Sequence, residues 1–181
     1  NEDGDHEEEI GGDVRLRYRS ALIADLTVNP DFALVEADVE QVNLTRFELF
    51  IPEKRPFFLE GNERFEQRIR QFYSRRIEDI DWGAKAISTV GTYDMIALGT
   101  QASVIDIGPE NIETQLDADY GVFRLQKAVM GSGNIGLLGA SRRLGDDNAG
   151  SVGVDTTLFF TDKIGFTGQY QQSHGPGDSG A

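Results

Sequence analysis

Hydrophobic and polar residues alternate with a period of two along residues 14–28. Such alternation predicts one long β-strand that buries one face and exposes the other. The turn-forming run Asn29-Pro30-Asp31 follows and is expected to end the strand. One face of this predicted strand carries Leu16, Tyr18, Leu22, Ala24, Leu26 and Val28, and the other carries mostly Arg15, Arg17, Arg19, Asp25 and Thr27.

The same alternation returns after Asp81 and continues almost to the end of the chain. It predicts strands near residues 82–90, 92–105, 118–130, 134–143, 150–161 and 163–172. Short turns are expected at 90–92, 131–133 and 161–163, and longer polar links at 106–117, at 144–149 and from Ser173. Strict alternation of short and long connections is typical of an up-and-down meander with tight turns at one rim.

The predicted fold class is therefore all-β, an antiparallel up-and-down meander of about seven strands. It corresponds to a partial or small β-barrel of the outer-membrane type, because the second face of the strands, rich in Gly, Thr, Gln and Asp, suits a wet lumen. A soluble meander or sandwich gives a similar alternation, so the pattern alone leaves both open. An acidic, disordered tail at residues 1–12 is expected before one β domain at 13–181, with hairpins over 81–173.

The segment between the first predicted strand and Asp81 has a different pattern. Residues 38–51 carry hydrophobic side chains at helical spacing, which favours a short helix. Residues 52–61 contain two prolines and should be irregular, because proline cannot donate to a strand ladder. Residues 62–77, rich in arginine and aromatic side chains, could form either a helix or an extended loop.

Charge and cysteine content narrow the choice of partners. The 31 acidic and 17 basic residues give a net charge of −14, which disfavours binding to nucleic acid. The chain has no cysteine, so disulfides and thiolate chemistry are excluded. His6 and His174 lie in apparent flexible segments without a second ligand nearby, so neither a metal nor another cofactor is expected.

Several uncommon strings occur in order along the chain: NPDFALVEADVEQVNLTRFELFIPEKRPFFLEG at 29–61, FYSRRI at 72–77 and GAK at 83–85. In these strings, strongest over residues 29–77, the chain resembles the DUF5916 family of bacterial envelope β-barrel proteins. The resemblance implies an outer-membrane or periplasmic location. Family members usually carry an amino-terminal family-9-type carbohydrate-binding domain, which is absent here, and a longer barrel, of which this chain resembles only the start. Sugar binding therefore transfers to no residue of this chain.

Two groups of residues are candidates for a site. Glu53, Lys54, Arg55 and Glu60 could form a buried salt-bridged cluster, or the two acids could serve glycoside hydrolysis, and the adjacent cations favour the structural reading. Tyr73, Arg75 and Arg76 could clamp a carboxylate or phosphate, or could pair with the many surplus acids of the chain. No catalytic residue is predicted, because nucleophile, phosphate-loop and dinucleotide motifs are lacking.

Three functions remain open at this point. The first is a non-catalytic outer-membrane or periplasmic barrel protein in envelope transport or glycan handling, with a membrane or membrane complex as partner and a glycan as a further candidate ligand. The others are an accessory structural subunit docked on a membrane complex, and a glycan hydrolase component. The barrel requires Asp94, Asp119 and Arg124 to face inward, and it favours Trp82, Tyr93, Tyr120 and Tyr170 as an interfacial belt.

Overall fold

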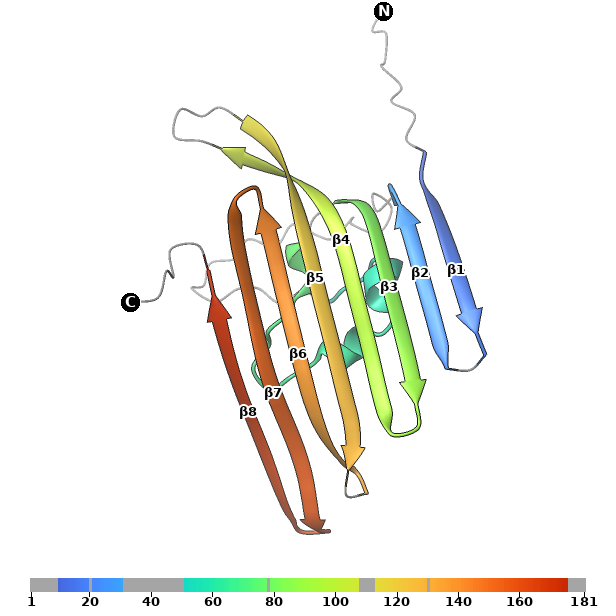
Figure 1. The fold of residues 1–181 in the computed structure, drawn as a ribbon, viewed down its shortest axis with the longest axis vertical. Helices are drawn as coiled ribbons and strands as arrows, with labels where there is room; N and C mark the ends of the chain where they lie inside the picture. The colour runs from blue at the N-terminus through green and yellow to red at the C-terminus, as the bar shows by residue number, and fades with distance from the viewer. Residues whose placement is uncertain are drawn as a thin grey trace, which may run out of the picture.

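The computed structural model describes residues 10–19, 21–30, 51–77, 79–107, 113–129 and 131–175. Eight antiparallel strands form one open sheet in which neighbours in sequence are neighbours in space (Figure 1). The all-β up-and-down meander predicted from the sequence is confirmed. The strands are β1 Gly12–Tyr18, β2 Leu22–Val28, β3 Ile80–Val90, β4 Tyr93–Ile107, β5 Glu113–Val129, β6 Gly133–Leu144, β7 Asp147–Thr161 and β8 Ile164–His174.

The long strand predicted over 14–28 is wrong in one respect, because it is a hairpin of β1 and β2. Arg19 has a left-handed backbone, with φ of 53°, and the chain reverses there. Tyr18 pairs with Leu22 across the turn, so even-numbered residues stay on one face of both strands. The alternation in the sequence therefore passes through the turn unbroken, and the assignment of residues to the two faces holds.

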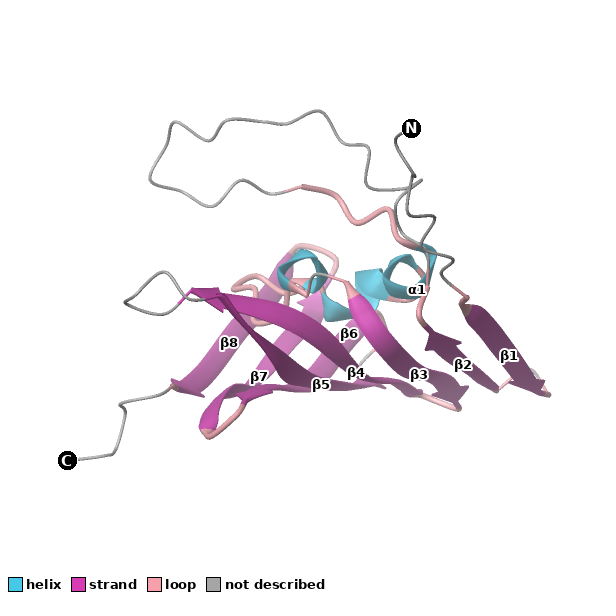
Figure 2. Ribbon diagram, turned by 90° about the horizontal axis from the view of Figure 1, so that it is seen from above, coloured by secondary structure: helices cyan, strands magenta, loops and turns pink. Residues whose placement is uncertain are grey.

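One further expectation requires correction. The polar link predicted at 144–149 is a tight turn of Gly145 and Asp146 between β6 and β7, with Gly145 at φ of 58°. The sheet is open, since β1 and β8 are its two opposite edges. One face of the sheet is covered by residues 51–77 of the β2–β3 connection (Figure 2).

We call residues 51–77 the covering segment and the side of the sheet on which they lie the covered face (Figure 2). The segment contains the helix α1 Pro56–Leu59 and two 3-10 turns, η1 Asn62–Phe65 and η2 Ser74–Arg76. Between these short elements its backbone is irregular. Of the helix predicted at 38–51, all but Ile51 lies outside the described residues, and the described helix lies in the stretch expected to be irregular.

The hydrophobic core lies between the covering segment and the covered face. Phe57, Phe58 and Phe65 supply the aromatic part of it, and the strands supply the aliphatic part. Glycine at position 83 makes this packing feasible, because a Cβ there would lie 2.6 Å from the ring of Phe57. The strand residues of the core are Ile80, Ile87, Ile96, Leu98, Ala102, Val122 and Leu138.

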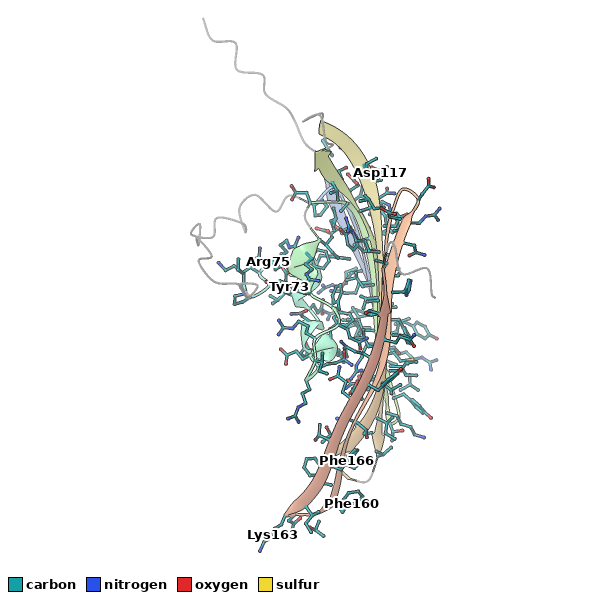
Figure 3. All side chains as sticks on the ribbon, turned by 90° about the vertical axis from the view of Figure 1, so that its left-hand side faces the viewer. Tyr73, Arg75, Asp117, Phe160, Lys163 and Phe166 are labelled. Atoms are coloured by element: carbon teal, nitrogen blue, oxygen red, sulfur yellow. The ribbon has the colours of Figure 1, made fainter. Side chains whose placement is uncertain are left out.

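The opposite side of the sheet, which we call the bare face, has nothing packed on it among the described residues. Figure 3 shows side chains projecting from both sides of the sheet, with Tyr73 and Arg75 on the side of the covering segment. The bare face is predominantly apolar although it is exposed. Its large apolar residues, each at least 36% exposed, are Val14, Leu16, Tyr18, Leu22, Leu26, Val28, Trp82, Val90, Tyr93, Phe123, Ile135, Leu137, Val152, Val154, Phe166 and Tyr170.

Candidate functional site

A buried ion pair within the covering segment joins its two ends. The carboxylate of Glu53 accepts hydrogen bonds from the Arg55 guanidinium at 2.9 and 3.0 Å and from the Ser74 hydroxyl at 2.6 Å. Arg55 donates onward to the carbonyls of Ser74, at 2.9 Å, and Ile77, at 2.7 Å, and stacks over the ring of Phe58. The side chains of Glu53 and Arg55 are each 1% exposed. The pair is thus enclosed and hydrogen-bonded, and it joins residues 53–55 to residues 74–77.

Tyr73 and Arg75 strengthen the same junction from its margin. The Tyr73 hydroxyl accepts a hydrogen bond from the Ile51 amide and donates one to the Ile51 carbonyl, both at 2.9 Å. Arg75 donates to the Pro52 carbonyl at 3.2 Å, and its Nε lies 3.7 Å from the Glu53 carboxylate. In this structure both side chains therefore close the covering segment on itself.

A second cluster attaches α1 to the first three strands. Lys85 on β3 is buried, and its ammonium lies 3.3 Å from the carboxylate of Asp25 on β2. The ammonium also donates to the carbonyls of Phe57, at 2.7 Å, and Glu60, at 3.1 Å, which are groups that the end of a short helix leaves unpaired. Arg15 on β1 bridges the carboxylates of Asp25 and Glu60. The cost of burying the Lys85 ammonium is thus offset by the carboxylate beside it and by the two carbonyls that accept its hydrogen bonds.

A third cluster lies over the middle of the sheet. Arg124 on β5 forms a two-pronged ion pair with Asp155 on β7, one prong being 2.8 Å, and Gln67 of the covering segment donates to the same carboxylate at 2.6 Å. The intervening strand, β6, carries glycine at position 136. A Cβ at that position would lie 2.6 Å from the Arg124 guanidinium, so only glycine leaves room for the bridge.

The covering segment also reaches the far edge of the sheet. The side-chain amide of Gln169 on β8 accepts from the Ile69 amide at 2.8 Å and donates to the Ile69 carbonyl at 2.7 Å. Near the centre, Arg64 pairs with Asp94 on β4 at 3.1 Å. Polar contacts thus run from β1 to β8, and they hold a segment without long regular elements in one position.

The residues predicted from the sequence to form a site therefore do not form one cluster in the structure. Glu53 and Glu60, the two acids considered for hydrolysis, belong to different clusters, and Glu53 is enclosed by Arg55 and Ser74. Lys54 is exposed, and Arg76 lines a cavity at the other end of the segment. Five further residues of these clusters were not predicted from the sequence: Asp25, Lys85, Gln67, Asp155 and Gln169. For the four that lie on strands, the available signal was a polar or charged side chain on the face of the strand that also carries the hydrophobic core.

Metal-binding residues do not gather on this face. The structure, over the part of the chain it describes, contains no group of three or more His, Asp or Glu side chains placed to hold an ion. His174, expected in a flexible segment, is the last residue of β8, and His6 lies outside the described residues.

The stability contribution of Glu53 should depend on pH. Burial alone would raise the pKa of Glu53, but hydrogen bonds from Arg55 and Ser74 and the charge of Arg55 lower it below its ordinary value. The contribution is therefore complete above about pH 4.3 and is lost as pH falls through the lowered pKa of the folded state. In urea titrations of the chain and of Glu53→Gln, the difference in unfolding free energy should be constant near neutrality and shrink in acid. A difference that grows in acid would contradict the assignment.

Polar and amphipathic residues border the bare face at both ends of the strands. Near one end, the Trp82 indole donates to Gln101 at 3.3 Å, and Gln101 donates to Asp119 at 3.1 Å. Near the other, the ammonium of Lys127 lies 5.2 Å from the ring centre of Tyr93. Lys127 and Asp119 are eight residues apart on β5, which corresponds to roughly 27 Å of strand.

Between these borders, no charged side chain occupies a bare-face position of the eight described strands. Asp94 and Arg124 lie on the covered face, as a barrel requires. The prediction is wrong for Asp119, which lies on the bare face at the border of the apolar band and to that extent weakens the case for a barrel. Trp82, Tyr93 and Tyr170 are exposed on the bare face. Tyr120 points to the covered face, so it cannot belong to the belt predicted from the sequence.

No described helix has the length and apolar character needed to cross a membrane.

Comparison with known proteins gives one match. A family model described as "Domain of unknown function (DUF5916)" matches residues 1–101, which extend from the first residue into β4. No curated protein and no solved structure matches the chain. The family description assigns no activity, and nothing in the comparisons indicates catalysis. The family model covers more than half of the chain and includes the strings at 29–77 that suggested the resemblance, so the chain belongs to the DUF5916 family.

Proposed function

We propose that the chain forms part of the wall of a β-barrel in the bacterial outer membrane and acts without catalysis in envelope transport. The observation that supports this proposal is the bare face, an apolar surface across eight strands with polar borders. Soluble proteins rarely expose apolar surface on this scale. Lipid-facing barrel walls carry an apolar band about 25 Å tall between aromatic girdles, and the spacing of Asp119 and Lys127 matches that height.

The covered face has the character of a lumen in this proposal. Its ion pairs at Asp25, Lys85, Arg124 and Asp155 would be costly against lipid but are compensated by the covering segment. The covering segment would obstruct the lumen beside this wall and limit what passes through it. Its many polar attachments are the reason for proposing transport of a selected solute, a glycan included, rather than an open water-filled pore.

An open sheet edge does not occur in the hydrocarbon of a bilayer, because its backbone groups would lack hydrogen-bond partners. The proposal therefore requires the free edges of β1 and β8 to pair with further strands. Such strands could come from the same protein or from another copy. This requirement separates the proposal from a free-standing eight-stranded barrel, in which β1 and β8 would pair with each other.

The single tryptophan of the chain provides the test, because Trp82 lies at one border of the bare face. The purified chain would be folded into phosphatidylcholine vesicles whose acyl chains are brominated either near the headgroup or near the methyl end. We expect Trp82 fluorescence to be quenched by both lipids and more strongly by the shallow one, since indoles prefer the interface. The control is the chain mixed with brominated vesicles after folding in detergent-free buffer.

The other functions predict different results. An accessory subunit that docks on a membrane complex would be soluble and monodisperse without detergent, and neither brominated lipid would quench Trp82. That outcome would contradict the barrel proposal. A hydrolase would be detected by glycan turnover that is lost in Glu53→Gln or Glu60→Gln. We expect no such turnover, because these two acids hold the covering segment in place.

A further inference from the structure

A cavity of about 640 Å³ lies between the covering segment and the covered face, beyond the three ion clusters. One wall is formed by residues 71–77, and the other by β4 to β8. Its volume falls in the range of sites that hold small organic ligands, roughly 300–1,000 Å³. Nothing in the proposed transport function requires a cavity here, since a closed covering segment could pack directly on the strands.

The charge of the cavity is opposite to that of the chain. Among the described residues, its lining includes Arg76 and Arg142 and contains no carboxylate, although the chain has 31 acidic and 17 basic residues. Arg142 makes no ion pair among the described residues and stacks over the ring of Tyr120, with 5.9 Å to the ring centre. Positive groups collected where acids are excluded create a favourable potential for an anion.

Gln71 gives independent evidence for a ligand. Both polar atoms of its side-chain amide are buried, and neither has a hydrogen-bond partner in the protein. The amide lies over Gly153 of β7, where a Cβ would be only 2.5 Å from its oxygen, so the strand is shaped to admit it. Buried amides without a protein partner are uncommon in native proteins, and water, an ion or a bound ligand can supply the hydrogen bonds that they lack.

We propose that this cavity binds a ring-bearing organic carboxylate. The carboxylate would accept hydrogen bonds from Arg142, and the ring would lie against the aromatic surfaces of Phe72 and Tyr120. The Gln71 amide would donate to and accept from the polar substituents of the ring. The site is on the covered face, so the inference does not depend on what covers the bare face.

The test is equilibrium binding of glucuronate and benzoate to the full chain folded in detergent micelles, measured by calorimetry, with glucose as the neutral analogue of glucuronate. We expect saturable binding of at least one acid and none of glucose. Arg142→Gln should weaken binding roughly tenfold, because a charge-assisted hydrogen bond is lost. Arg143→Gln is the matched control, since residue 143 points to the bare face of the same strand, and it should leave affinity unchanged.

A second variant separates binding from folding. Gln71→Leu removes an amide that has no partner in the protein, so it should not lower the urea midpoint, yet it should weaken binding of glucuronate more than of benzoate. Glucuronate binding would indicate a hydroxylated ring as the natural class, and benzoate binding alone an apolar ring. The proposal fails if neither acid binds the folded chain, if glucose binds as tightly as glucuronate, or if Arg142→Gln and Arg143→Gln weaken binding equally.

Discussion

Replacing Arg55 with methionine should lower the free energy of unfolding by about 3–5 kcal/mol, the usual effect of removing one partner from a buried ion pair. The Glu53 carboxylate would keep its hydrogen bonds from Ser74 and from the backbone but would lose its hydrogen-bonded cation, leaving Arg75 at 3.7 Å as the nearest positive charge. The carbonyls of Ser74 and Ile77 would lose a donor as well. Urea titration in detergent micelles, followed by circular dichroism, measures the loss.

Two comparison variants show whether charge burial is the cause. Arg68→Met removes an exposed arginine from the same segment and should change stability by no more than about 0.5 kcal/mol. The double variant Glu53→Gln/Arg55→Met removes both charges and should be more stable than Arg55→Met alone, because no unpaired charge remains buried. Equal stability of Arg55→Met and Arg68→Met would mean that the pair does not hold the covering segment.

The strands were the part of this molecule that the sequence could predict, because alternation is a local property. Six strands were placed within a few residues of their observed bounds, and the faces of β1 and β2 were assigned correctly despite the missed turn. The turn was missed since Arg19, Ser20 and Ala21 include no glycine, proline or asparagine. The prediction of a long link at 144–149 was wrong because polar residues there suggested a loop where the strands in fact continue. These polar residues lie in a tight two-residue turn and at the exposed ends of strands.

The site could be predicted only in part, because its contacts join residues far apart in the chain. Glu53 and Arg55 are neighbours, and their pairing was within reach of sequence reasoning. The contacts of Ile69 with Gln169 and of Gln67 with Asp155 depend on the path of the covering segment across the sheet. No local pattern encodes that path. Two glycines in the strands are nevertheless related to that path: Gly83 leaves space for Phe57, and Gly136 leaves space for Arg124.

Replacing Val152 with arginine should lower the stability of the chain in vesicles by about 2–4 kcal/mol, the cost of a cation on the lipid face near the middle of a bilayer. Val152 lies on the bare face of β7 and is level, through Gly139 of β6, with Phe123 of β5, midway between the borders marked by Lys127 and Asp119. Arginine there cannot reach either border as easily as Lys127 does. Reversible urea titration in phosphatidylcholine vesicles measures this loss.

The matched control is Gln171→Arg, which adds the same charge on the covered face of β8, where residue 171 is exposed and would face the lumen. We expect a change within about 0.5 kcal/mol there, because water remains available to the guanidinium. The two variants have the same charge and differ chiefly in the face they modify. A similar small change for both would mean that the bare face does not contact lipid. A large loss confined to Val152→Arg would support a membrane-facing wall.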